Sequence, residues 1–318
     1  MPAIITLTPN PALDLATTTG RVQPTHKLRC GPVQRFAGGG GINVARVLHR
    51  LGADVQAWAL AGGAAGTQVQ QLLAAEGVPT AVQTIAGDTR ENFSVVETAT
   101  SQEFRFVLPG PTLLPAEWQA CLDALAALPA PPRWLVASGS LPPGTPPDFY
   151  AQLARSLAAR GVRVVIDTSG PPLAAALQAG VAMVKPSLRE LRELLQQPLA
   201  DAADWCAAAQ SLVRNGAAEA VALSLGDQGA LLATRAGVWQ APALNVPAST
   251  GTTGAGDCFL AALVWALDRG DTPAEALRWG VAAGAAALLH AGTTLAHADD
   301  VQRLVHSVPP PVAIATQP

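Results

Sequence analysis

A run of small residues towards the end of the sequence, STGTTGAGD at 249–257, ends in a carboxylate. The apolar residues that follow predict a helix that begins at this turn. The first N–H groups of a helix have no partner within it, so those of Gly254, Ala255 and Gly256 can bind an anion. Asp257 would repel a bound phosphate, but it could take the proton from a hydroxyl that attacks that phosphate. The stretch therefore predicts phosphoryl transfer to an alcohol; the alternative is a glycine-rich turn with an acidic residue at a helix N-terminus.

A second run of small residues, GGGGINVARVL at 38–48, also leads into a predicted helix. Ile42, Ala45 and Leu48 share one helical face, which places the glycines at the helix start. No Gly-Lys-Ser/Thr follows, so this is not a Walker A loop, and the run does not follow the first strand as a dinucleotide-binding fingerprint would. We expect the glycines to let the backbone approach a ligand closely. Asn43 either caps the helix or binds a sugar hydroxyl.

Residues 4–8 predict a buried first strand, and the turn after it presents Asn10 and Asp14 at the carboxyl end of that strand. Ligands of open α/β sheets bind at this edge. Asp14 is therefore a candidate to accept hydrogen bonds from substrate hydroxyls. The alternative is a carboxylate that only stabilises the turn.

Two stretches, about 15–37 and 80–109, lack helical periodicity and contain short alternating segments. Within the second stretch, 93–97 and 103–107 predict antiparallel strands around a Thr-Ser-Gln turn. We expect the two stretches to form a small β-sheet that covers the site as a lid.

Only two of the 20 basic residues are lysines, Lys27 and Lys185. A chain that otherwise uses arginine favours lysine where a compact ammonium charge is needed. In the predicted lid, Lys27 and Arg90 would meet above the substrate and bind a second anionic group such as a sugar phosphate. The alternative for either residue is a solvated surface charge.

From about residue 115 onward, predicted strands and helices alternate. This alternation is typical of an α/β fold with a doubly wound, mostly parallel sheet and helices on both of its faces. Each predicted strand ends in a turn at one common edge. Residues in these turns include Ser140, Lys185, Ser187, Glu190, Ser224, Gly226 and Gly229.

The overall composition fits a single α/β domain over 1–318. The chain is 49% hydrophobic and 14% charged, with a net charge of −3, so we expect no nucleic-acid or membrane partner. The four cysteines are scattered without metal-ligand spacing, and the start of the chain predicts a strand instead of a signal peptide. We therefore expect a cytoplasmic protein, with a disordered proline-rich tail at 308–318.

Taken together, the two glycine-rich motifs and the intervening turns resemble the ribokinase-like (PfkB-type) carbohydrate kinases over about residues 4–305. Within that family the sequence is most similar to the phosphofructokinase branch. The segments KLRC at 27–30, AGGA at 61–64, RFV at 105–107, SGSLPPG at 138–144 and SLG at 224–226 carry this closer similarity.

The resemblance implies a role for each matching position. Asp257 would be the general base for the C1 hydroxyl of the sugar, with the N–H groups of Gly254, Ala255 and Gly256 forming the anion hole. The residues implied at the sugar are Asp14, Gly39, Gly40, Asn43 and Ser140, with Lys27 and Arg90 at its 6-phosphate. Those implied at the nucleotide are Lys185, Ser187, Ser224, Gly226, Gly229 and Thr252.

Two ions also follow from the resemblance. Glu190 would position Mg²⁺ through water, as in the Asn-x-x-Glu motif of the family. The motif departs here, because Ser187 stands where the family has asparagine. A monovalent cation, K⁺, would lie beside the anion hole between 251–253 and 287–294.

The implied reaction is ATP-dependent phosphorylation of fructose 6-phosphate to fructose 1,6-bisphosphate. Fructose 1-phosphate and tagatose 6-phosphate remain alternative acceptors, whereas ribose and adenosine carry no phosphate for Lys27 and Arg90. A non-catalytic protein that binds a nucleotide or a sugar is the alternative from another class, and a dinucleotide-dependent enzyme lacks its fingerprint. The predicted lid would have exposed edges and an apolar face, so we expect a homodimer that pairs two lids.

Overall fold

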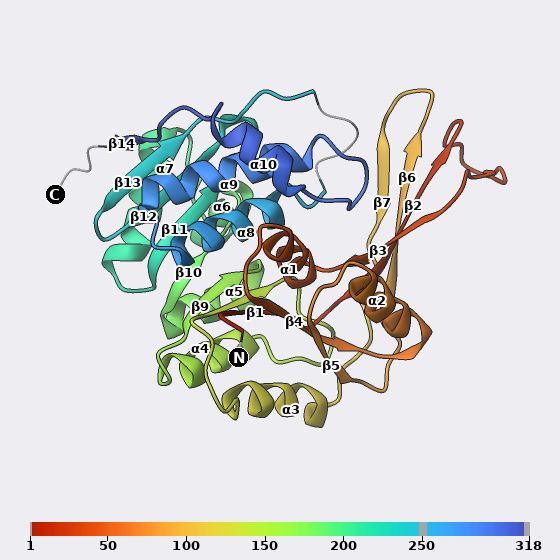
Figure 1. Ribbon diagram of the computed structural model, residues 1–318, viewed down its shortest axis with the longest axis horizontal. Helices are drawn as coiled ribbons and strands as arrows, with labels where there is room; N and C mark the ends of the chain where they lie inside the picture. Colours follow the sequence, from red (N-terminus) through yellow and green to blue (C-terminus); the bar gives the residue numbers. More distant parts are fainter. Residues whose placement is uncertain (1, 248–252, 315–318) are drawn as a thin grey trace.

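The computed structural model describes residues 2–247 and 253–314, which form a ten-stranded sheet, a four-stranded sheet and the helices packed against them (Figure 1). The strands of the large sheet are, in spatial order, β14 (Val312–Ile314), β13 (Gly237–Ala241), β12 (Ala230–Thr234), β11 (Ala218–Ser224), β10 (Val181–Val184), β9 (Arg163–Asp167), β8 (Trp134–Ser138), β1 (Ile4–Thr8), β4 (Val55–Ala61) and β5 (Thr80–Thr84).

The large sheet is built around β1, whose five residues are all buried. β1 pairs in parallel with β4 on one side and β8 on the other, so the chain winds in both directions from this strand. Parallel pairing continues from β8 to β11, and β12, β13 and β14 then extend the sheet in antiparallel fashion. This is the predicted doubly wound, mostly parallel sheet.

Helices cover both faces of the large sheet, which separates two hydrophobic cores. On one face lie α1 (Gly40–Arg50), α2 (Gly63–Ala75), α8 (Ala255–Asp268), α9 (Pro273–Ala287) and α10 (Ala298–Val305). On the other face lie α3 (Pro115–Ala126), α4 (Phe149–Ala158), α5 (Gly170–Ala179), α6 (Leu188–Leu195) and α7 (Ala202–Arg214). Within the described residues, no helix has the length and apolar character needed to cross a membrane.

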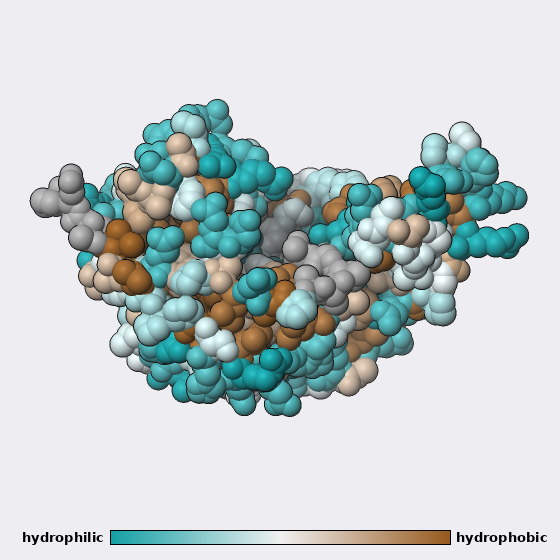
Figure 2. All heavy atoms as spheres, turned by 90° about the horizontal axis from the view of Figure 1, so that it is seen from above, coloured by the Kyte–Doolittle hydropathy of each residue, from teal (hydrophilic) through white to brown (hydrophobic). Residues whose placement is uncertain are grey.

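The small sheet has the order β3-β2-β6-β7 and projects from one side of the body (Figures 1 and 2). Its strands are β3 (Gln34–Gly38), β2 (Ala12–Thr19), β6 (Arg90–Glu97) and β7 (Glu103–Phe106). β2 and β6 are parallel, and the outer pairs are antiparallel. Hydrophilic residues cover the end of the projection that lies farthest from the body (Figure 2).

Three details of the expected small sheet were wrong. Asp14 lies on β2 and not in the turn after β1, because the chain extends again from Ala12. Residues 80–84 form β5, which pairs in parallel with β4 and therefore belongs to the large sheet. The segment 27–30, one of the short alternating segments in the first expected lid stretch, forms no strand.

The proline-rich tail also differs from the expectation of disorder over 308–318. Val308 is buried, and the apolar residues of β14 pair with β13 at the edge of the large sheet. Residues 315–318, the rest of the predicted tail, lie outside the described residues.

Candidate active site

The carboxyl ends of the central strands and one face of the small sheet enclose a cleft of about 380 Å³. Nine of the residues predicted for the site line it: Asp14, Gly39, Gly40, Asn43, Arg90, Ser140, Glu190, Gly254 and Asp257. Four residues to which the sequence analysis gave no role line it as well, Asn92, Arg105, Ser138 and Asp167. Thr253 and Thr293, from the two segments predicted to hold K⁺, also line it.

The start of α8 forms one wall of the cleft. Gly254 precedes the helix with a left-handed φ of 79°, and Asp257 lies in the first helical turn. Gly254 and Asp257 both line the cleft, so the start of this helix, whose first N–H groups have no partner within it, lies beside the carboxylate. Asn43, near the start of α1, donates from Nδ2 to Asp257 Oδ2 at 2.8 Å. One of its two expected roles was contact with a sugar; the structure shows that its amide nitrogen holds the carboxylate.

The surroundings of Asp257 change its acidity. Burial and the negative charge of Asp167 raise the pKa of Asp257 to about 7, against the opposing effects of the Asn43 hydrogen bond and the Lys185 charge. A carboxyl with a pKa near neutrality can take up a proton from a hydroxyl and release it again. Asp257 is therefore suited to act as a general base.

Lys185 and Asp167 form a buried ion pair beside this wall. Lys185 Nζ lies 3.0 Å from Asp167 Oδ1, and Ser138 Oγ donates to Asp167 Oδ2 at 3.0 Å. Burial alone would lower the pKa of Lys185, but the charge and hydrogen bond of Asp167 raise it, so the ammonium stays protonated. Its Nζ is 3.4 Å from the position that a Cβ on Gly256 would take, next to the predicted anion hole.

Asp167 was missed by the sequence analysis, although a signal was present. It is the last residue of a buried parallel strand, β9, and such strand ends collect at the edge where ligands bind. The same reasoning had been applied to Asp14.

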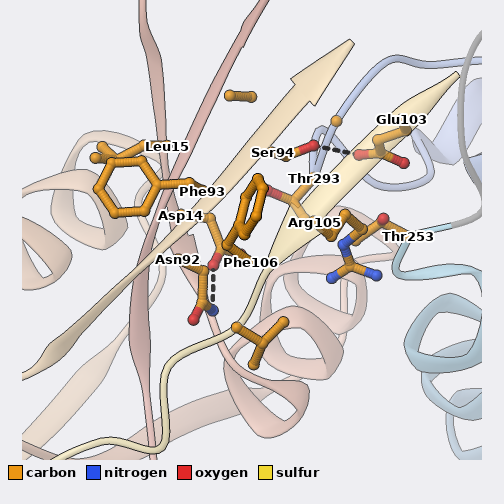
Figure 3. Close-up of a pocket in the computed structure, with 13 residues that line it drawn as sticks. Asp14, Leu15, Asn92, Phe93, Ser94, Glu103, Arg105, Phe106, Thr253 and Thr293 are labelled. Atoms are coloured by element: carbon orange, nitrogen blue, oxygen red, sulfur yellow. Dashed lines mark hydrogen bonds between the residues drawn. The ribbon is translucent and has the colours of Figure 1, made fainter. Parts of the chain in front are cut away.

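The small sheet contributes polar side chains to the opposite wall. Figure 3 shows three of them, Asp14, Asn92 and Arg105, in an adjoining pocket that shares these residues with the cleft. Asn92 Nδ2 donates to Asp14 Oδ1 at 2.9 Å, and the Leu108 N–H donates to Asn92 Oδ1 at 3.2 Å. Burial raises the pKa of Asp14. Arg105 extends from β7 towards Thr253 on the body (Figure 3). This wall therefore presents a carboxylate, an amide and a guanidinium to whatever enters the cleft.

The two predicted phosphate ligands are not brought together within this chain. Arg90 donates to two backbone carbonyls, that of Leu108 at 2.7 Å and that of Asn10 at 3.0 Å. Its guanidinium lies at the cleft and connects the segment that follows β7 to the turn that follows β1. Lys27 is exposed in the segment 20–33 between β2 and β3 and does not line the cleft. The expected meeting of Lys27 and Arg90 above the substrate is therefore not seen.

The glycine run serves the packing of the chain itself. A Cβ on Gly40 would lie 2.2 Å from Ser138 Oγ, and one on Gly41 would lie 2.4 Å from the carbonyl oxygen of Leu7. The start of α1 thus packs directly on the ends of β1 and β8. Our expectation that the glycines serve approach to a ligand needs this correction: most of the space that they free is filled by protein.

The residues predicted for the nucleotide lie at the ends of neighbouring strands. Ser187 N–H donates to Glu190 Oε2 at 2.8 Å and Glu190 N–H donates to Ser187 Oγ at 3.3 Å, a capping box at the start of α6. Ser187 also forms a β-bridge with Ser224. Gly226 begins the 3₁₀ turn that Gly229 follows, and Thr252 lies outside the described residues.

The family of the chain follows from the match of its sequence to a family model. The model of the pfkB family carbohydrate kinases matches residues 10–300. The chain belongs to this family. The kinase is 44% identical over 98% of its length to the ATP-dependent 6-phosphofructokinase isozyme 2 of Mycobacterium tuberculosis, covering 92% of that protein. It is 40% identical over 96% of its length to the isozyme 2 of Escherichia coli, covering 98% of that protein.

Solved structures agree with this assignment. The Escherichia coli phosphofructokinase-2 in complex with fructose-6-phosphate superposes with a TM-score of 0.91 at 38% identity, with 97% of this kinase and 99% of that chain covered. The fold and the recognition of the family from two glycine-rich motifs are therefore confirmed.

The residues of the cleft fit the two predicted ions. Glu190 and Asp167 offer carboxylate oxygens, and one or two carboxylates together with substrate phosphates are the usual ligands of Mg²⁺. Thr253 and Thr293 lie on the two segments predicted to hold K⁺. Their hydroxyl oxygens are buried and have no partner among the described residues, as expected for oxygens that a cation would coordinate.

Proposed function

We propose that this kinase transfers the γ-phosphoryl group of ATP to the C1 hydroxyl of fructose 6-phosphate, giving fructose 1,6-bisphosphate and ADP. The observation that carries the proposal is Asp257, which has a pKa near neutrality and lines the cleft in the first turn of a helix that begins beside Gly254, another residue of the cleft. The names of the relatives at 44% and 40% identity support the choice of acceptor.

In the reaction, Asp257 takes the proton of the attacking hydroxyl. Asn43 fixes the carboxylate through one oxygen, which leaves the other free to face the hydroxyl. The N–H groups at 254–256 and the Lys185 ammonium stabilise the charge on the transferring phosphoryl group. Positioning and electrostatic stabilisation supply most of the catalysis in phosphoryl transfer, and these residues are proposed to provide both.

The acceptor binds between the two walls. Asp14, held by Asn92, accepts hydrogen bonds from sugar hydroxyls, and Gly39, Gly40 and Ser140 close the space around the ring. Arg90 lies beside the cleft, where its remaining N–H groups meet the phosphate of the acceptor. Lys27 stays a predicted phosphate ligand. Because it is exposed between β2 and β3 and does not line the cleft of its own chain, we propose that it reaches the phosphate in the cleft of a second copy.

The nucleotide binds along the ends of β10 and β11. Ser187, Ser224, Gly226, Gly229 and Thr252 are its proposed contacts, with Lys185 at the phosphates. Mg²⁺, when bound, neutralises charge on the ATP phosphates, and Glu190 is proposed to orient it through water. K⁺ is proposed beside the anion hole at Thr253 and Thr293; the Escherichia coli phosphofructokinase-2 has been solved in complex with potassium.

We also propose that the small sheet is a lid through which two chains form a homodimer. Leu15, Phe93 and Phe106 are neighbours across β2, β6 and β7, and Phe93 and Phe106 are 44% and 57% exposed. An exposed apolar face of this kind is typical of an interface. The four free cysteines fit the proposed cytoplasmic location.

The relatives within the family also point to a second candidate acceptor, fructose 1-phosphate. A 1-phosphofructokinase of Xanthomonas campestris is 39% identical over 83% of the kinase and 83% of that protein. Fructose 1-phosphate and tagatose 6-phosphate would use the same base and anion hole, and would differ in how the second wall holds the phosphate.

The deciding experiment is ADP release from Mg-ATP with fructose 6-phosphate, fructose 1-phosphate, tagatose 6-phosphate, fructose, ribose and adenosine. We expect the highest kcat/KM with fructose 6-phosphate. Preference for another phosphosugar would change the proposed acceptor and leave the family and the transfer chemistry as proposed. Preference for an unphosphorylated acceptor would contradict the proposed phosphate contacts, and no turnover with any acceptor would support a non-catalytic binding protein.

A further inference from the structure

The segment 288–297, between α9 and α10, packs directly behind the start of α8. Leu295 is buried in a left-handed conformation with φ of 65°, and its Cδ2 lies 2.4 Å from the position that a Cβ on Gly254 would take. The Ala296 N–H donates to Cys258 Sγ at 3.4 Å. The segment therefore contacts α8 on both sides of Asp257 in the sequence, and it also carries Thr293 into the cleft.

Two arginines of α1 hold the backbone of this segment. Arg46 Nη1 donates to the carbonyl oxygen of Thr293 at 3.0 Å. Arg50 Nη1 donates to those of Thr294 at 2.7 Å and Ala296 at 3.2 Å. Three carbonyls of a segment without helix or strand are thereby bound to side chains from the helix that also supplies Asn43.

A single carboxylate binds both guanidinium groups and so fixes their orientation. Glu76, at the end of α2, lies 2.7 Å from Arg46 Nη2 and 2.9 Å from Arg50 Nη2. Burial would raise the pKa of Glu76, but the hydrogen bonds and charges of the two arginines hold it below its usual range, so the carboxylate stays ionised. The planar guanidinium fork lets each arginine bind Glu76 and a carbonyl at the same time.

We propose that Arg50 is a positioning residue of the phosphoryl-transfer site: it fixes the backbone at 294–296, and through that backbone the place of the anion hole and of Asp257. Arg50 touches neither the cleft nor a substrate, and it acts through Leu295 and Ala296 on Gly254 and Cys258. A small displacement of catalytic groups lowers the rate of the chemical step while the ground-state contacts with substrate remain. The inference rests on the proposed kinase function for its kinetic consequence.

The chain contains a matched control for the chemistry of Arg50. Arg278 on α9 also donates to two backbone carbonyls, those of Val305 and Val308, and also pairs with a glutamate, Glu275. Its side chain is 20% exposed, as is that of Arg50. Arg278 holds the end of α10 and the segment after it, which do not line the cleft.

The test compares Arg50→Gln with Arg278→Gln, using the acceptor that the wild type prefers. Both variants should lower the melting temperature to a similar extent. Arg50→Gln should lower kcat by about 10- to 100-fold with both KM values within about threefold of wild type, whereas Arg278→Gln should leave kcat nearly unchanged. Arg50→Lys should recover part of the loss. Equal kcat values for the two glutamine variants would overturn the proposal.

Deuterium exchange provides a measurement that does not depend on activity. The peptide covering 288–297 should exchange faster in Arg50→Gln than in wild type, and at the wild-type rate in Arg278→Gln. Unchanged exchange would overturn the proposal even if the kinase proves to use another acceptor. If Arg50→Gln does not fold, Glu76→Gln keeps both guanidinium groups and should show a smaller loss of kcat in the same direction. A wild-type kcat in Glu76→Gln would contradict the role given to the cluster.

Discussion

The two sheets meet at the cleft with different degrees of burial. Every residue of β1 and β8 in the large sheet is buried, whereas β6 and β7 in the small sheet are mostly half-buried or exposed. The large sheet and its helices bring Asp167, Glu190 and Asp257 to the cleft, and the small sheet brings Asp14, Arg90, Asn92 and Arg105.

This difference has a physical basis. Burial and nearby negative charge both raise the pKa of a carboxyl, and on the body they bring that of Asp257 to about 7. Groups that recognise a sugar must instead be reached from solvent, and a partly exposed sheet allows this. We therefore propose that the large sheet determines whether transfer occurs and that the small sheet determines what is phosphorylated. The following experiments test that division.

The largest effect is expected on the body, from Asp257→Asn. Removing the general base should lower kcat by about 10²- to 10⁴-fold. Binding of ATP and of the sugar phosphate, measured by calorimetry, should remain within a few fold of wild type. Asp268→Asn, at the other end of the same helix and paired with Arg133 on the surface, is the control and should keep its turnover. Wild-type turnover in Asp257→Asn would sink the proposed mechanism.

On the small sheet, Asp14→Ala should change acceptor use and leave nucleotide use intact. Loss of hydrogen bonds to a carboxylate, at about 1.5–3 kcal/mol each, should lower kcat/KM for the sugar phosphate by about 10- to 100-fold. The KM for ATP should not change. Glu91→Gln lies on the neighbouring strand opposite Leu13 and should behave as wild type. An equal rise in both KM values would contradict the division between the sheets.

The same contrast explains how much of the fold could be predicted from the sequence. The strands of the large sheet are short apolar runs that alternate with helical segments, and this pattern by itself indicates a doubly wound sheet. The strands of the small sheet show only short alternating segments, so the extent of β2 was missed. β5 is an edge strand of the large sheet whose residues are all half-buried or exposed, so it lacks the apolar run of the central strands and was assigned to the wrong sheet.

For the site, sequence could identify groups but not most of their partners. Asp257 and Lys185 stand out by type and position, yet the bond from Asn43 to Asp257 joins residues 214 positions apart. The expected pairing of Lys27 with Arg90 failed because the segment 20–33 is exposed and carries Lys27 away from the cleft lining. Contacts between distant segments depend on side-chain packing, which residue spacing does not encode.

The outer face of the small sheet is the proposed dimer interface, whereas the exposed edge of the large sheet is not, so charges placed on the two should have different effects on the oligomeric state. Phe106→Asp places a charge in the proposed interface, so we expect this variant to be a monomer, and the wild type a dimer, by analytical ultracentrifugation at micromolar concentration. Val312→Asp on β14 is the matched control, because Val312 is 64% exposed and Phe106 is 57% exposed. If Phe106→Asp is still a dimer, or if the wild type is a monomer, the proposed interface through the lid is contradicted.

The smallest expected effect is a shift in the pH midpoint of kcat/KM. Measuring this midpoint in variants of each sheet compares the two sheets directly. The acid limb of kcat/KM should have its midpoint near pH 7 in the wild type, because Asp257 must be deprotonated to act as a base. The negative charges of Asp167 and Asp14 both raise the pKa of Asp257, with Asp167 the stronger of the two. Asp167→Asn should therefore move the midpoint to lower pH, and Asp14→Asn should move it less in the same direction.

The control for this shift is Glu219→Gln, which removes a carboxylate that is paired with Arg163 on the surface. Its midpoint should stay at the wild-type value. A larger shift for Asp14→Asn than for Asp167→Asn would mean that the small sheet closes over the base more tightly in solution than the half-buried β2 indicates. In that case the small sheet would help to set the acidity of the base, and the division between chemistry and recognition would fail at Asp14.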